Sequence, residues 1–235
     1  APARPSLTFG PPSEGVNTID WVESVLNRIV HVQNLRRIAT LDGGVGLAGV
    51  PFEITIEPYD PETGEVVEHV PADDGATRPQ RLPGVLAINI SNPNDFPIDV
   101  TLLYIDANYG VSSLFPRRNE DNRLQPGDGF VNPFLLQVTD DPVGVESLLA
   151  IAVRGEGQAV SFEMLTRPSI AETVGVRDAQ RVVESPLGAL LRDATYQTAR
   201  DGAVTQPAEA DYAMQLFTWE VLEASPEGAE RGGDN

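Results

Sequence analysis

Residues 82–106 read LPGVLAINISNPNDFPIDVTLLYID, and this stretch is the clearest indication of the fold class. Apolar and polar residues alternate over 82–92, and residues 98–106 are rich in β-branched side chains, so both runs are predicted to be β-strands. The residues between them, 92–97, hold two prolines and two asparagines, a composition typical of a turn. We therefore expect two consecutive strands joined by a short turn.

The same kind of pattern continues on both sides of this stretch. Further strands are expected at 51–58, 65–70, 111–116, 130–139, 146–154 and 211–222, and residues 158–165 are expected to form a strand or a short helix. The turns between them are rich in Gly, Pro and Asx residues, residues 117–129 form a long loop, and residues 72–83 are a polar break. Short strands at this spacing predict a mainly β protein: an antiparallel β-sandwich with one N-terminal helix and one or two short C-terminal helices.

The N-terminal helix is predicted over residues 18–39. Asp20 and Glu23 have the spacing of a capping box, and Thr18 is the alternative N-cap. The apolar residues at near-helical spacing, which we expect to face the sheet, are Val22, Leu26, Ile29 and Val30, with Leu35 and Ile38 as further members.

The organisation of the chain follows from these elements. We expect a linker at 1–16, which contains four prolines, and a connecting helix with an acidic hairpin at 17–80. The sandwich itself is expected at 81–222 and a disordered tail at 223–235. A short helix is predicted at 185–196, because Ser185 and Pro186 are favourable residues at a helix N-terminus.

Charge and cysteine content exclude several classes of function. The formal net charge is −19, and all 16 basic residues are arginines, so a duplex nucleic acid or an anionic membrane surface would be repelled. No apolar run reaches the roughly 18 residues that a membrane span needs. The chain contains no cysteine, which excludes disulfides, thiolate metal sites and a cysteine nucleophile within it.

Few residues carry a recognisable catalytic pattern. The two histidines, His31 and His69, lack an evident nucleophile or orienting partner, so a structural role is favoured for each. No P-loop, dinucleotide-binding glycine pattern or G-x-S-x-G motif is present, and no carboxylate pair stands out as that of a hydrolase.

The sequence DANYG at 106–110 begins like a calcium-binding loop. Asp106, Asn108 and Gly110 form a D-x-N-x-G pattern, but the position of the closing bidentate glutamate is Arg117, which cannot bind calcium. A tight turn between strands explains the same residues and is favoured. Weak calcium binding stays open, because further oxygen ligands follow at Asp121, Asn122 and Asp128.

Charged residues gather in two kinds of segment. Residues 53–74 hold eight acidic residues and no arginine, so this segment is a solvated hairpin or a surface for a basic peptide. Clustered arginines either pair internally with the acidic excess or receive an acidic partner; they are Arg36, Arg37, Arg117, Arg118 and Arg123.

The order of segments over 84–154 resembles a known family. The run from Val85 to Pro116, the segment NRLQPGDGF at 122–130 and the segment GVESLLAIAV at 144–153 are similar to a domain of unknown function. That domain follows the catalytic domain in bacterial caspase-family (metacaspase-like) peptidases. The helix ending in NLRRIA at 34–39 resembles the segment that joins the catalytic domain to this accessory domain, and the strand that contains Trp219 fits the same pattern.

The resemblance implies a function without a catalytic residue. Peptidases of that family cleave after basic residues with a Cys–His dyad, and this chain has no cysteine to match it. We therefore expect a non-catalytic accessory domain, regulatory or substrate-recruiting, whose partner is the caspase-like catalytic domain, in cis or after cleavage, or a protein substrate. Processing by the parent peptidase is expected at Arg78 and Arg81 in the polar break.

The binding surface is expected on the loops, because loops carry function on rigid sheets. Its candidate residues are Asp106, Asn108, Arg117, Arg118 and Asp121. No cofactor is expected. The alternative function is a free-standing extracytoplasmic module that binds protein or carbohydrate, with calcium as a structural ion.

Overall fold

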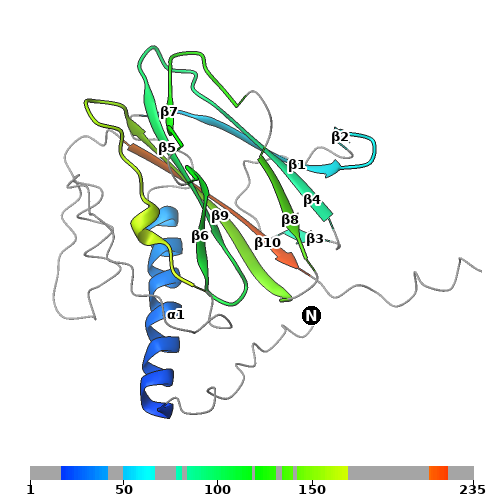
Figure 1. The fold of residues 1–235 in the computed structure, drawn as a ribbon, viewed down its shortest axis with the longest axis vertical. Helices are drawn as coiled ribbons and strands as arrows, with labels where there is room; N and C mark the ends of the chain where they lie inside the picture. Colours follow the sequence, from blue (N-terminus) through cyan, green and yellow to red (C-terminus); the bar gives the residue numbers. More distant parts are fainter. Residues whose placement is uncertain are drawn as a thin grey trace, which may run out of the picture.

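The computed structural model describes residues 17–41, 50–66, 78–80, 84–117, 120–130, 134–139, 142–168 and 212–221. These residues form two β-sheets packed face to face, with one long helix, α1, against the outer face of the larger sheet (Figure 1). The expected mainly β sandwich with an N-terminal helix is confirmed.

The smaller sheet has four strands in the order β2-β1-β4-β8. All three pairings in it are antiparallel, and β1 pairs with β4 from Glu53 opposite Ser91 to Tyr59 opposite Val85. The bounds of the strands are β1 Glu53–Asp60, β2 Glu65–Val66, β4 Gly84–Ser91 and β8 Phe134–Val138.

The larger sheet has the order β3-β10-β9-β5-β6, with the short β7 also paired to β5. Its pairings are antiparallel except that of β3 with β10, which is parallel. The bounds are β3 Arg78–Gln80, β5 Ile98–Ile105, β6 Val111–Phe115, β7 Arg123–Leu124, β9 Gly144–Arg154 and β10 Tyr212–Val221.

Two hydrophobic cores lie on the two faces of the larger sheet. One core fills the space between the sheets, where Val100 and Leu102 of β5 meet side chains such as Ile88 of β4. The other lies beneath α1, where Leu103 and Ile105 of the same strand meet the helix. The strand β5 is therefore apolar on both faces, which explains why its sequence is an almost continuous apolar run.

The helix α1 spans Thr18–Leu41. Its N-terminus is capped by Asn17, whose side-chain oxygen accepts a hydrogen bond from the backbone N–H of Ile19 at 2.8 Å. Both expected caps are therefore wrong: Thr18 and Asp20 already lie inside the helix, one and three residues after the cap.

The rotation of α1 differs from the expectation. The buried apolar residues are Val25, Val32, Leu35 and Ala39, so the expected Leu35 is confirmed. Ile38 packs against the same core, also as expected, whereas Ile29 is only partly buried. Three residues expected to face the sheet are instead exposed; they are Val22, Leu26 and Val30.

The break expected at 72–83 is wrong in part, because it contains β3. Of the two alternatives expected for residues 158–165, the structure has the short helix: a 3-10 helix, η1, spans Glu163–Leu165. Of the strand expected at 65–70, the structure describes only β2. The linker at 1–16, the helix at 185–196 and the tail at 223–235 lie outside the described residues.

Candidate functional site

The residues Asp106–Gly110 form the turn that joins β5 to β6. A carboxylate oxygen of Asp106 accepts a hydrogen bond from the backbone N–H of Gly110 at 2.8 Å, and Tyr109 adopts a positive φ of 60°. The turn interpretation of this motif is therefore confirmed, with Asn108 half-buried within it. In the part of the chain that the structure describes, no three His, Cys, Asp or Glu side chains are grouped so as to hold a metal ion.

The other predicted binding residues lie at the opposite end of β6. The Arg117 guanidinium lies 5.3 Å from the centre of the Phe134 ring, and Asp121 accepts a hydrogen bond from the backbone N–H of Arg123. A five-residue strand is roughly 16 Å long, so Asp106 and Asn108 are not brought together with Arg117 and Asp121. Arg118 lies outside the described residues.

Of the two arginines at which processing is expected, the structure describes one. Arg78 begins β3, where it stands in register with Trp219 of β10. Arg81 lies outside the described residues. Cleavage at either residue stays a prediction.

Two buried asparagines, Asn92 and Asn122, hold the segment around β7 to the sandwich. The Asn92 side-chain amide donates to three backbone carbonyls, those of Phe96, Leu124 and Gln125. The Asn122 amide donates to two more, one in β5 and one after β9. Asn92 and Asn122 both lie in the segments that resemble the accessory domain, and here their side chains hold parts of the fold together. The preference of Asn for turns indicates this role only in part.

An ion pair between the buried Asp99 and the partly exposed Arg123 adds to these clamps. Asp99, fully buried in β5, accepts two hydrogen bonds from the Arg123 guanidinium at 2.7 and 2.9 Å and a third from the backbone N–H of Val160. The same guanidinium also donates to Gly157 O. The hydrogen bonds to Asp99 raise the pKa of Arg123. Arg123 therefore pairs with an acidic residue of its own chain, which is one of the two roles expected for the clustered arginines.

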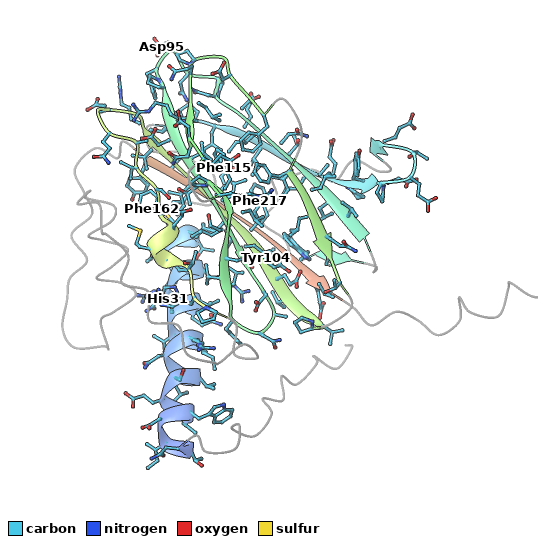
Figure 2. All side chains as sticks on the ribbon, in the orientation of Figure 1. His31, Asp95, Tyr104, Phe115, Phe162 and Phe217 are labelled. Carbon is cyan, nitrogen blue, oxygen red and sulfur yellow. The ribbon has the colours of Figure 1, made fainter. Side chains whose placement is uncertain are left out.

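A second carboxylate is buried near the other end of the sandwich. Glu146 of β9 accepts a hydrogen bond from the Trp219 indole N–H at 3.0 Å and another from Tyr104, whose ring stacks near that of Trp219. Burial raises the pKa of Glu146, and the nearby Asp106 raises it further. In Figure 2, Tyr104 lies toward the lower part of the sandwich and Asp95 marks its upper end.

The histidine of α1 has a structural partner. His31 is buried, and its Nε2 lies 2.9 Å from the backbone oxygen of Leu165 in η1 (Figure 2). Burial lowers the pKa of His31 to about 4. A neutral ring bonded to a main-chain carbonyl joins α1 to η1, in agreement with the structural role expected. His69 lies outside the described residues.

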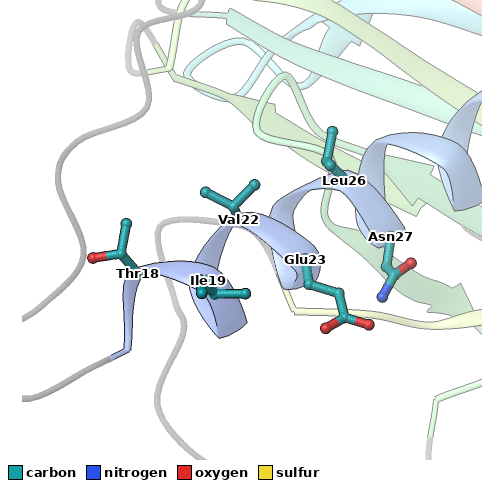
Figure 3. Close-up of a pocket in the computed structure, with 6 residues that line it drawn as sticks. All are labelled: Thr18, Ile19, Val22, Glu23, Leu26 and Asn27. Atoms are coloured by element: carbon teal, nitrogen blue, oxygen red, sulfur yellow. The ribbon is translucent and has the colours of Figure 1, made fainter.

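The feature that sequence reasoning missed is the exposed apolar face of α1. We call it the α1 face and define it as Ile19, Val22, Leu26 and Val30, whose exposed fractions are 74%, 41%, 55% and 47%. Figure 3 shows the groove along its N-terminal part, which is also lined by Thr18, Glu23 and Asn27.

The α1 face and the packed face lie on opposite sides of the helix. At 100° per residue, Leu26 points roughly 180° away from Leu35, which is buried beneath the helix. The N-terminal turns of α1 also extend beyond the ends of the strands (Figure 1). A helix that is apolar on both sides is expected to be covered on both, and an exposed apolar patch marks an interaction surface.

Comparisons with protein-family models, with curated proteins and with solved structures give no match. Within the described residues, no helix is long and apolar enough to cross a membrane. The candidate site therefore has to be chosen from the side chains themselves. The polar groups described above hold the loops to the sandwich, and α1 has an exposed apolar surface.

Proposed function

We propose that this chain is a non-catalytic accessory domain of a caspase-like cysteine peptidase, and that the α1 face docks the catalytic domain. The observation that carries the proposal is the exposure of four apolar side chains along one side of α1. The resemblance of residues 34–39 to the segment that joins the two domains supports it, because these residues belong to the same helix.

The energy available from the α1 face is sufficient for a specific contact. Full burial of an apolar side chain of this size stabilises a complex by about 1.5–3 kcal/mol. The exposed parts of Ile19, Val22, Leu26 and Val30 together amount to about two complete side chains, so burying them contributes roughly 4 kcal/mol. The α1 face therefore contributes to docking together with further contacts between the two domains.

The chemistry of the chain supports a role in docking or recruitment. It has no cysteine, and the histidine that the structure describes is bonded to a backbone carbonyl. The acidic groups with the strongest interactions, Asp99 and Glu146, are occupied by Arg123 and by Trp219 with Tyr104. These groups stabilise the fold and leave the α1 face for binding.

The first test is the coding sequence upstream of Ala1. The proposal requires a caspase-like domain with a Cys–His dyad to be encoded there; a gene without one would overturn it. That domain, produced as a separate chain, is expected to bind the present chain in isothermal titration calorimetry.

Two leucines of similar exposure provide a matched pair of variants. Leu26 on the α1 face is 55% exposed and Leu135 on β8 is 50% exposed. Leu26→Asp is expected to weaken binding of the catalytic domain at least tenfold, about 1.4 kcal/mol, and Leu135→Asp to leave it unchanged. Equal affinities for the two variants would show that the α1 face is not the docking surface.

A further inference from the structure

The spacing of the α1 face matches a helix–helix seam. Ile19, Val22 and Leu26 are separated by three and four residues, and Ile29 and Val30 supply the next position. Apolar residues at alternating spacings of three and four form the seam by which one helix packs against another. The four residues of the α1 face extend over roughly 16 Å, about three helical turns.

The charges beside the N-terminal half of the seam are acidic; the exposed Arg37 lies on the same side of α1, seven residues after Val30 and beyond the end of the seam. Asp20 and Glu23 are exposed on the N-terminal half of α1, and Glu23 lines the groove beside Val22 and Leu26. The basic residue of this half, Arg28, is only partly exposed, and its position on the helix places it on the packed side. A partner with basic residues beside its own apolar stripe would complement this surface.

Charge argues against a second copy of this chain as the occupant. Pairing of two α1 helices through this face would bring together two N-terminal halves that both carry exposed Asp20 and Glu23.

We infer that the α1 face accepts an amphipathic α-helix of its partner, with an apolar stripe flanked by Lys or Arg. The inference deepens the proposed function and rests on it for the identity of the partner. The partner helix packs alongside α1, with its apolar stripe against Leu26 and its basic residues toward Glu23.

The test uses three fluorescein-labelled helical peptides, each about three heptads long, and the full chain. The first peptide has Leu at the seam positions and Lys beside them, the second has Glu in place of Lys, and the third is a scrambled form of the first. Fluorescence anisotropy is expected to show binding of the first peptide, binding roughly threefold weaker for the second, and none for the scrambled peptide. The scrambled peptide controls for attraction of any Lys-rich peptide to a chain of net charge −19.

Variants locate the binding on α1. Leu26→Asp is expected to abolish binding of the first peptide, with Val30→Glu as a second variant and Leu135→Asp as the unaffected control. Glu23→Lys is expected to reverse the preference between the Lys and Glu peptides. Equal binding of all three peptides, or binding that Leu26→Asp and Val30→Glu leave unchanged, would overturn the inference.

The outcomes separate this inference from the proposed function. If the Lys peptide binds the α1 face and the upstream domain does not, the proposed function fails and the helical partner stands. If the catalytic domain binds and the peptides do not, the proposed function stands and the helical partner is wrong. A dimer in sedimentation velocity that Leu26→Asp abolishes would identify a second copy as the occupant and would overturn the inference.

Discussion

The same substitution at two leucines of α1 tests how the helix is rotated. Leu35 is fully buried in the core beneath the helix, and Leu26, nine residues earlier, is 55% exposed on the α1 face. Replacing a buried leucine by alanine costs 2–5 kcal/mol, because apolar contacts are lost and a cavity remains. We expect Leu35→Ala to lower the free energy of unfolding by about 3 kcal/mol. Leu26→Ala should change it by less than about 0.5 kcal/mol.

Urea denaturation followed by far-ultraviolet circular dichroism measures both values. A loss of 3 kcal/mol corresponds to a melting temperature lower by roughly 10 °C for a protein of this size. Alanine has a slightly higher helix propensity than leucine, so the intrinsic effect on the helix is small and the same at both positions. The difference between the two variants therefore reports burial alone.

The result that would refute this reasoning is a large loss for Leu26→Ala with little loss for Leu35→Ala. It would mean that α1 packs through the face containing Val22 and Val30, as the spacing of apolar residues first indicated. In that case the α1 face would be part of the core, and the docking proposals would lose their basis.

Three further predictions concern the buried charged groups. Arg123→Leu leaves the carboxylate of Asp99 buried without its cation and should cost 3–5 kcal/mol in urea denaturation; the double variant with Asp99→Asn should recover part of this loss, and strictly additive losses would contradict the coupling. Because burial lowers the pKa of His31 to about 4, the stability due to its neutral form is complete above pH 6.5 and is lost as the pH falls toward 4. His31→Gln should remove this acid dependence, worth at most about 3 kcal/mol, and an unchanged pH profile would count against it. Burial raises the pKa of Glu146, so its contribution is complete below the usual carboxyl pKa and is lost as the pH rises. Glu146→Gln should therefore be more favourable relative to wild type at pH 8 than at pH 4, and a difference independent of pH would refute the assignment.

The strands could be predicted from the sequence because the residues that indicate each strand lie within the strand itself. Residues 98–106 and 211–222 have the apolar content and alternation of strands, and the structure places β5 and β10 there. Side chains of β10 also alternate between the two cores, with Phe217 and Trp219 on one side and Met214 on the other.

The rotation of α1 and the strand β3 were not predictable in the same way. The helix has apolar residues on two opposite sides, and a local pattern does not tell which side meets the sheet. The strand β3 has the sequence Arg-Pro-Gln, which lacks an apolar pattern, and its position depends on pairing with β10 about 140 residues later in the chain. Both features depend on tertiary contacts that override local preference.

The polar residues show why candidate sites are hard to assign from sequence. Asp106 and Asp121 have the composition of binding loops, yet each accepts a hydrogen bond from a backbone N–H close by in the chain. Asp99 and Asn92 have their main partners 24 to 33 residues away. Nothing in the local sequence distinguishes a polar side chain that clamps a fold from one that binds a ligand.

The place of β10 has a consequence for how the protein is made. It has the highest residue numbers of the described strands, yet it lies inside the larger sheet, between β3 and β9. Until residues 212–221 leave the ribosome, β9 is an edge strand with unpaired backbone groups and apolar side chains on both faces. The sheet therefore closes late in synthesis, and a nascent chain released before this point would expose a surface that promotes aggregation. A chain that contains β10 can therefore cover the edge of β9, whereas a chain that ends before residue 212 leaves this edge open.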